Sequence, residues 1–592
     1  ILDIYFKMGV PGFFKWLWDK YKKTNFVFQK SNKLDPSLQQ EISTIDYLLI
    51  DANCLIHPTC FKVLAENPDF TNQDNLENKM MNASIEYIEK LIEYVDPKVG
   101  IYLAIDGVAP AAKIKQQRSR RFKSVHDREM WDNIKRKHDK PVGKFWNNSA
   151  ITPGTEFMEK LHYKILAWAK KRKESSNVKI IYSSCKTPAE GEHKLLQFIR
   201  TNIKNDEHYK YVMYGLDADL IFLCLATNSN NMYLLREANQ MDKNKSGFNY
   251  VSIDIMRGLI VDTIENIAKD GQDNSLKDTR LIDIKYKDNI INDFIFMCYL
   301  LGNDFLPHIP ALNIYTDGLD ILLDKYTELL SMNNYQKFII KRTSKNVTID
   351  TKLFVDLITF LGSEESEILK NEHVTKRRYY KCNSTDPYDI EVHRIDNLQF
   401  KINDPVMLGS DESEHWKKRY YSHYFNTDDN EIEEFSTKLV SEYMKGLVWV
   451  TKYYFDKCPS WTWFYPFDYP PFLEDMSEFL EKNKKYNLNK IKFDYGAPLK
   501  PFNQLLLVLP PQSSYLIPKE LTKVVHNSNS TLAYMYPTVI HQDFIGKVRH
   551  WMAIPQLPAI DLELVKKIYL KYEKKIPEST LNRNKKLNVF TF

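Results

Sequence analysis

Acidic residues follow three short apolar runs of the sequence. The pairs are residues 47–50 with Asp51, residues 101–105 with Asp106, and residues 211–214 with Asp217 and Asp219. Because the carboxyl ends of parallel strands gather at one edge of a sheet, where ligands bind, we expect these carboxylates to converge. A single aspartate after a strand is more often a turn former or a helix N-cap. The prediction of a shared acidic site therefore depends on the recurrence of this pattern after three strands.

The segment Thr187–Lys194 adds two more acids, Glu190 and Glu192. Thr187 and Glu190 fit a capping box, which would make Glu190 a structural residue at a helix start. That interpretation leaves Glu192 unexplained, and Gly191 between the two acids is a poor choice for helix stability alone. We therefore expect both glutamates at the same edge as the aspartates.

A further acid, Asp304, lies in the sequence Gly302-Asn303-Asp304-Phe305, after the apolar helix expected over 290–301. Gly302 is typical of a residue that ends a helix, and the alternative for Asp304 is an ordinary cap of the next turn. The proposed catalytic and metal-binding set is Asp51, Asp106, Glu190, Glu192, Asp217, Asp219 and Asp304.

Seven carboxylates in one pocket would raise one another's pKa unless cations neutralise them. Mg²⁺, with Mn²⁺ as the alternative, prefers oxygen ligands, and two such ions can clamp the attacking and leaving oxygens of an in-line displacement. The chemistry that this set predicts is phosphodiester hydrolysis with two bound ions.

A basic stretch follows Asp106. If the chain is helical from Pro110, one helix face carries three cations and an amide: Lys113, Gln117, Arg120 and Arg121. Most runs of charged residues form a solvent-exposed helix face without a ligand. This one would lie beside the acidic pocket, where arginine can hold a phosphate through paired hydrogen bonds. We interpret it as a phosphate-binding face.

The alternation of short apolar runs with amphipathic stretches predicts an α/β fold with a mostly parallel central sheet flanked by helices. Besides the three runs above, strands are expected over 179–182 and 232–235, and helices over 83–95, 154–172 and 189–200.

Four segments are expected along the chain. They are residues 1–7, interpreted as a tag remnant before Met8, a catalytic region over 8–330, a variable polar link over 331–430, and a second, mainly helical, aromatic-rich region over 431–592.

The composition fits an ordinary globular protein. Of 592 residues, 43% are hydrophobic, and 82 Lys+Arg against 77 Asp+Glu leave a net charge of +5. No apolar run approaches the ~20 residues that a membrane span needs, so we expect a soluble protein. Seven dispersed cysteines without a CxxC pair favour a reducing compartment and no zinc site. We predict a cytoplasmic monomer, with the nucleus as the alternative location.

Several motifs occur in the order found in one nuclease family. They are MGVPGFFKWL (8–17), DGVAP (106–110) with KxxQQRSRRF (113–122), EGEHK (190–194), YGLDADLI (214–221), GNDFLPHIP (302–310), SWTWFYPFDYPP (460–471), PFNQLLLVLPP (501–511) and WMAIPQLPAID (551–561). The chain thereby resembles the XRN family of 5′→3′ exoribonucleases from Met8 to its last residue.

The resemblance implies a PIN/FEN-like nuclease core and Mg²⁺-dependent, processive removal of mononucleotides from single-stranded RNA with a 5′-monophosphate. The seven acids match the family's metal-binding set, and the basic face matches its 5′-phosphate pocket, which is too small for a cap or triphosphate. His57 matches a histidine that stacks on the 5′-end base, opposed by a tryptophan, Trp461 or Trp463. Ala189 departs from the glycine usual in the family. Core packing is the alternative for His57 and the tryptophans.

Two other functions compete. A flap-type, structure-specific DNA nuclease would share the acidic core, but Pro307-His308-Ile309-Pro310 stands where such enzymes have a Gly-rich hairpin, and proline lacks the backbone donor. A catalytically silent RNA-binding protein would have lost carboxylates, and all seven are present.

Overall fold

The computed structural model describes residues 12–24, 26–30, 34–205, 208–215, 218–238, 247–270, 280–343, 346–374 and 381–592. Residues 1–7 and Asp217 lie outside the described residues.

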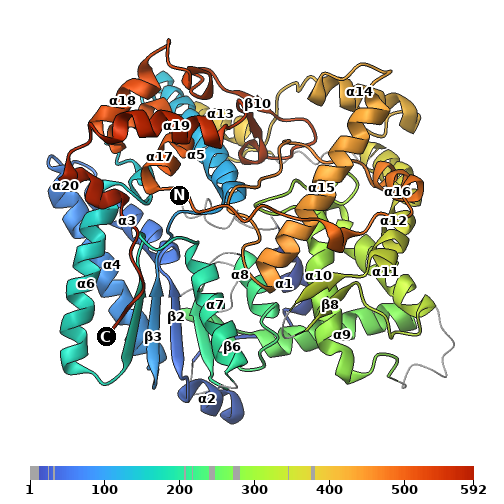
Figure 1. Cartoon of the computed structure of the whole chain (residues 1–592), viewed down its shortest axis with the longest axis horizontal. Coiled ribbons are helices and arrows are strands. Elements are labelled where there is room, and N and C mark those ends of the chain that lie inside the picture. The colour runs from blue at the N-terminus through green and yellow to red at the C-terminus, as the bar shows by residue number, and fades with distance from the viewer. Residues whose placement is uncertain are drawn as a thin grey trace.

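An eight-stranded sheet forms the centre of the first region, with the order β1-β7-β6-β5-β2-β3-β4-β12 (Figure 1). Its five parallel strands are β2 (Tyr47–Asp51), β3 (Gly100–Ala104), β4 (Lys179–Ser183), β5 (Tyr211–Tyr214) and β6 (Met232–Glu237). Three antiparallel strands complete it: β1 (Val27–Phe28), β7 (Phe248–Ser252) and β12 (Phe590–Thr591). The five parallel strands are the five that the sequence predicts, so the mostly parallel sheet is confirmed.

Helices cover both faces of this sheet because alternate strand residues point to opposite sides. Leu48 and Ile50 of β2 belong to one apolar core, and Leu49 belongs to the other. The first face packs on α3 (Asn53–Glu66), α4 (Gln73–Val95) and α6 (Glu156–Ser175). The second packs on α1 (Phe13–Tyr21), α7 (Gly191–Lys204), α8 (Ala218–Leu225), α9 (Ile253–Lys269) and α10 (Lys287–Cys298). Helix α2 (Pro36–Ser43) lies at the lower end of the sheet in Figure 1.

The segment between the two regions is largely helical. It contains α11 (Gly318–Met332), the hairpin β8 (Ile340–Arg342) and β9 (Val347–Ile349), α12 (Thr351–Val374), α13 (Pro387–Asp396) and α14 (Ser413–Phe425). Leu357 and Leu361 of α12 are fully buried, so this helix is part of the core that continues into the second region. The region boundaries stay a prediction.

The second region consists of helices and two short strands. They are α15 (Ile432–Phe455), α16 (Leu473–Lys482), α17 (Pro501–Val508), α18 (Lys519–His526), α19 (Leu562–Glu573), α20 (Glu578–Leu581), β10 (His541–Asp543) and β11 (Ile554–Gln556). Among the described helices, none has the length and apolar character that crossing a bilayer requires.

Helix α5 (Ala111–Lys137) joins the two regions. It starts after Pro110, as predicted, and its buried Arg118 donates hydrogen bonds to the carbonyls of Leu507, at 2.8 Å, and Met535. In Figure 1 the helix runs beside α17, with which it is in contact. The apolar residues of α17 and α19 pack with one face of α5 in a third core.

Candidate active site

The edge at which the parallel strands end carries the predicted aspartates. Asp51 is the last residue of β2 and pairs with Ala104 of β3, so Asp106 follows two residues beyond that pair. Lys194 of α7 holds the strand ends together by donating to the carbonyls of Ile105, at 2.6 Å, and Ser184, at 3.0 Å. Burial lowers the pKa of Lys194 to about 8.

The glycine between the two glutamates has a steric reason. The Gly191 N–H donates to Asp106 Oδ1 at 2.7 Å, and a β-carbon at residue 191 would stand 2.7 Å from Asp51 Oδ1. The first turn of α7 therefore approaches both aspartates so closely that only glycine fits.

The capping box, which was the structural alternative for Glu190, does not form. Helix α7 begins at Gly191 with Glu190 as N-cap residue, and no side-chain capping bond forms. Thr187 Oγ1 instead donates to the carbonyl of Leu587 at 2.9 Å, so the segment after α20 fixes this turn. Ala189 has a φ of 98°, in the region that favours glycine, and its backbone is held by hydrogen bonds with Gly107 and Val108 at 2.9 Å.

The carboxylates of Glu190 and Glu192 both belong to the acidic cluster. With the His193 ring they offer three ligand atoms within 4.8 Å of one another. Burial, and then the charges of Glu190 and Asp219, raise the pKa of Glu192 well above its ordinary value, and Lys113 only partly offsets them. The positive charge of Lys113 therefore does not neutralise the buried negative charge around Glu192.

Lys113 is the protein's own counter-charge in this cluster. Its Nζ lies 2.7 Å from Glu190 Oε1 and 2.6 Å from Asp304 Oδ2, and these carboxylates raise the pKa of Lys113 despite its burial. Arg120 Nη2 lies 3.1 Å from Asp304 Oδ1. Burial would raise the pKa of Asp304, but Lys113 and Arg120 more than offset this and lower it.

The donor set fits a divalent metal. Six of the seven predicted acids are described, and Asp51, Glu190, Glu192, Asp219 and Asp304 are linked by the contacts and charges given above, with Asp106 joined through Gly191. Carboxylate oxygens are the ligands that Mg²⁺ and Mn²⁺ prefer. Lys113 and Arg120 together cannot neutralise six carboxylates, so a cation of higher charge is the natural complement.

The second region supplies a contact to this cluster that the sequence did not indicate. Tyr453 of α15 donates its hydroxyl to Glu190 Oε2 at 2.7 Å. The Tyr453 ring is buried between His193, with ring centroids 3.6 Å apart, and Trp449, at 4.6 Å. The only sequence signal was the aromatic richness of 449–472.

A cavity of about 2140 Å³ opens beside the acids. The predicted phosphate face of α5 lines it, namely Lys113, Gln117, Arg120 and Arg121. Gln504 of α17 orients Gln117 by donating to its Oε1 at 3.0 Å. Arg121 is the member suited to a ligand: its buried Nη1 has no hydrogen-bond partner within the described chain, and burial lowers its pKa to about 10.

His57 on α3, the predicted base-stacking residue, lines the same cavity. Burial and the Arg121 charge lower the pKa of His57 to about 4, so the ring is neutral near pH 7.

Trp551, rather than Trp461 or Trp463, is the second-region tryptophan among the described residues lining the cavity. Trp463 stacks on Trp449 with centroids 5.6 Å apart, and the Trp461 carbonyl accepts from the Ala111 N–H at 3.1 Å. Trp461, between Ser460 and Thr462, and Trp551, after Arg549-His550, both have polar neighbours, so the local sequence did not distinguish them.

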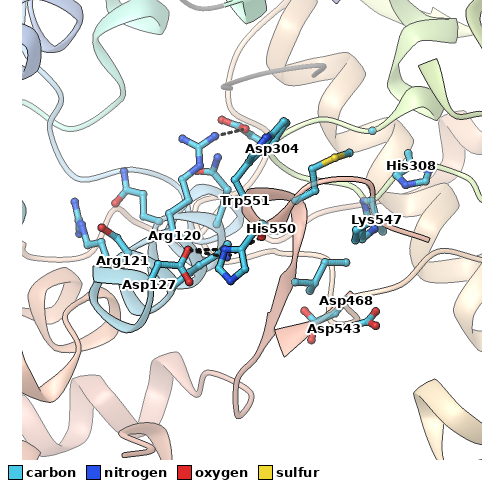
Figure 2. A pocket seen from close by; sticks show the side chains of 18 of the residues that line it. Arg120, Arg121, Asp127, Asp304, His308, Asp468, Asp543, Lys547, His550 and Trp551 are labelled. Carbon is cyan, nitrogen blue, oxygen red and sulfur yellow. Dashed lines mark hydrogen bonds and ion pairs between the residues drawn. The ribbon is translucent and has the colours of Figure 1, made fainter. Parts of the chain in front are cut away.

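Helix α5 holds the loop that carries Trp551. Lys123 Nζ donates to the carbonyl of His550 at 3.3 Å and to Asp127 Oδ2 at 2.8 Å. Asp127 Oδ1 also accepts from Gln542 of β10 at 2.7 Å. Figure 2 shows Asp127, His550 and Trp551 beside Arg120, so one helix positions both the phosphate face and the tryptophan.

Comparison with known proteins identifies the family. The model of the XRN 5′-3′ exonuclease N-terminus matches residues 8–238, and that of the Xrn1 helical domain matches residues 284–398 and 371–592. The chain therefore belongs to the XRN family of 5′→3′ exonucleases.

Curated relatives carry corresponding names. The 5′-3′ exoribonuclease 1 of Homo sapiens is 30% identical over 94% of this chain and 33% of its own length. The 5′-3′ exoribonuclease 2 of Candida albicans is 27% identical over 98% of this chain and 74% of its own length, and that of Arabidopsis thaliana is 28% identical over 98% and 69%. The chain thus spans a third of the human relative.

Two solved structures also match. One is the T5 D15 protein co-crystallised with metal ions, which is 8% identical over 55% of this chain and 92% of its own, with a TM-score of 0.22. The other is the catalytic core of Rad2 in complex with a DNA substrate, which is 11% identical over 80% of this chain and 95% of its own, with a TM-score of 0.26. These TM-scores are too low for either likeness to define the fold.

Proposed function

We propose that the protein is a processive 5′→3′ exoribonuclease that hydrolyses single-stranded RNA carrying a 5′-monophosphate to mononucleotides. The observation that carries this proposal is the contact between the acidic cluster and the cationic face of α5. Asp304 lies within 3.1 Å of both Lys113 and Arg120, so a phosphate held on that face would have its neighbouring phosphodiester beside the acids.

Two Mg²⁺ ions, with Mn²⁺ as the alternative, would be held by the six described acids together with Asp217, and would supply an activated water and stabilise the leaving oxygen. Lys113 bridges Glu190 and Asp304 and so holds the two carboxylates in a fixed orientation. Tyr453 fixes the other oxygen of Glu190. The protein's contribution is therefore a set of carboxylates whose positions are established before substrate binds.

The 5′-phosphate would bind to Arg121, Arg120 and Gln117. The buried Arg121 Nη1 without a described partner offers a charge-assisted hydrogen bond to a phosphate oxygen. Gln117, held by Gln504, closes this end of the pocket. Acceptance of a monophosphate and rejection of a cap or triphosphate follow from the family resemblance.

The first base would stack between His57 and Trp551. A neutral imidazole suits stacking better than a charged one would in a site that already holds Arg121. Base stacking on such rings contributes about 1–3 kcal/mol per base and is tolerant of sequence, as a degradative enzyme requires.

The direct test compares decay of one RNA with a 5′-monophosphate, 5′-hydroxyl, 5′-triphosphate or cap, with and without Mg²⁺. Arg121→Gln should lower the preference for 5′-monophosphate over 5′-hydroxyl by about tenfold or more, because a charged hydrogen bond contributes ~1.5–3 kcal/mol. Arg136→Gln, on the exposed far end of the same helix, is the matched control. An unchanged preference in Arg121→Gln would contradict the phosphate pocket.

A DNA flap in the same assay tests the flap-type nuclease, and preferred cleavage of the flap would overturn the choice of RNA. The cytoplasmic location and the monomeric state stay predictions.

A further inference from the structure

Two polar residues line the cavity on the side away from Arg121 and have no part in the functions assigned above. His308 follows the turn that carries Asp304, and Lys547 lies in the loop between β10 and β11. Figure 2 shows them beside one another, and the Lys547 charge acts on the His308 ring. Two segments 239 residues apart therefore bring an imidazole and an ammonium to one wall.

The orientation of His308 is fixed by its surroundings. Gly302 has a φ of 88°, and a β-carbon there would stand 2.9 Å from the His308 nitrogen and 3.0 Å from its Cβ. His308 Nδ1 lies 3.0 Å from the carbonyl of Ile309. Because a carbonyl only accepts, Nδ1 carries the proton, and a neutral ring leaves Nε2 as an acceptor.

The His308 ring is neutral near pH 7. Burial, and then the charge of Lys547, lower the pKa of His308 to about 4. Within the described part of the chain Nε2 has no hydrogen-bond partner. The ring therefore presents one acceptor that requires a donor from a ligand.

Lys547 is a cation that has no ion-pair partner in the part of the chain that the structure describes. The Asp543 charge acts on Lys547, but both Asp543 oxygens are engaged elsewhere. Oδ2 accepts from the hydroxyls of Tyr469, at 2.9 Å, and Tyr424, at 3.3 Å, and Oδ1 accepts from the Ile545 N–H at 2.9 Å. Lys547 Nζ forms no ion pair with a carboxylate among the described residues. An ammonium in a cavity wall with no ion pair is suited to an anion.

A nucleotide of RNA satisfies both groups together. Its phosphodiester is an anion without a proton to donate, so it suits Lys547 and not His308 Nε2. Its ribose 2′-hydroxyl is a donor that every nucleotide carries, whereas donors on the bases differ from base to base. The 2′-hydroxyl is also the group by which a protein tells RNA from DNA.

We infer that His308 and Lys547 form a ribose–phosphate subsite for one nucleotide downstream of the scissile bond, in which Lys547 binds the phosphate and His308 Nε2 accepts the 2′-hydroxyl hydrogen. The inference deepens the proposed function and rests on it for the direction of the strand. It gives the enzyme a sequence-independent contact that selects RNA.

The test measures binding, so that it does not depend on catalysis. A short 5′-phosphorylated RNA with a 3′ fluorophore is titrated with the full chain in EDTA, and fluorescence anisotropy gives Kd. A series of the same RNA carries a single 2′-deoxy nucleotide at each successive position. The parent protein should lose about tenfold in affinity at one position, since a hydrogen bond contributes up to ~1.5 kcal/mol.

His308→Phe keeps a ring of similar size and removes the acceptor. It should bind the all-RNA oligonucleotide about tenfold more weakly and show no loss at the sensitive position. Lys547→Gln should instead lower the slope of log K against log salt by about 0.7, the change expected for one phosphate contact with a single strand. Lys571→Gln, exposed on α19, should leave the slope unchanged.

The outcomes separate the subsite from the proposed function. A parent scan without a sensitive position, or a scan unchanged by His308→Phe, would overturn the subsite even if RNA decay is found. A sensitive position abolished by His308→Phe, without metal-dependent decay, would support the subsite and contradict the proposed function. No RNA binding at all would overturn both.

Discussion

Tyr453→Phe removes one hydroxyl from the contact between the second region and the acidic cluster. The hydroxyl donates to Glu190 Oε2 at 2.7 Å, while the ring packs between His193 and Trp449. Phenylalanine keeps these ring contacts. The loss is therefore confined to one hydrogen bond to a buried carboxylate.

A hydrogen bond to a charged group contributes ~1.5–3 kcal/mol, which corresponds to about 10- to 150-fold in an equilibrium constant. Glu190 keeps a second anchor, because Lys113 Nζ remains 2.7 Å from Oε1. We therefore expect the lower end of this range, about a tenfold increase in the Mg²⁺ concentration that gives half-maximal RNA decay, as is typical for residues that orient metal ligands.

The assay combines calorimetric titration of Mg²⁺ or Mn²⁺ with rates of RNA decay against Mg²⁺ concentration. Tyr326→Phe is the matched control, because Tyr326 makes the same kind of buried bond, 2.8 Å to Asp293 Oδ2, away from the site. Both variants should lose stability, but only Tyr453→Phe should need more metal. Equal metal affinity in Tyr453→Phe and the parent would refute the positioning of Glu190 by the second region.

Three other predictions concern the close approach of Gly191 to Asp51, the stability of the fold at low pH, and the bound metal. Gly191→Ala, which places a β-carbon 2.7 Å from Asp51 Oδ1, should lower the RNA decay rate by about 100-fold or more with the circular dichroism spectrum retained; normal decay would contradict the close approach. Burial and Lys186 lower the pKa of His162 to about 4, below its unfolded value of ~6.5, so its contribution to stability is complete above pH 6.5 and is lost as the pH falls towards 4. Urea unfolding should therefore show that, from pH 7 to pH 4.5, the free energy of unfolding falls by about 2–3 kcal/mol less in His162→Phe than in the parent. Equal falls in the two proteins would contradict the buried neutral ring. EDTA should stop RNA decay reversibly, and added Mg²⁺ should raise the melting temperature, because an ion that binds only the folded state stabilises it; an unchanged melting temperature would argue against a bound ion.

The sheet could be predicted because its signals are local. Each parallel strand is a short run buried on both faces, such as the stretch that ends at Asp51, and a parallel arrangement places all such ends on one edge. The convergence of Asp51 and Asp106 follows from that register. The basic face was predictable for the same reason, since helical spacing alone relates Lys113 to Arg121.

Contacts that join distant segments had no local signal. Thr187 donates to the carbonyl of Leu587, 400 residues away, in place of the capping box that was the structural alternative for Glu190. Tyr453 reaches Glu190 across 263 residues. The choice of Trp551 over Trp461 and Trp463 likewise depends on how the second region folds around α5, which residue types alone do not encode.

The most direct test of the central claim follows the fate of a 5′ label. A single-stranded RNA with a ³²P 5′-monophosphate is incubated with the protein and Mg²⁺, and products are resolved over time. The first labelled product should be a nucleoside 5′-monophosphate, with no labelled intermediates of other lengths and no release in EDTA. Labelled fragments from internal cuts or 3′ shortening, or equal release in EDTA, would contradict a metal-dependent 5′→3′ exoribonuclease.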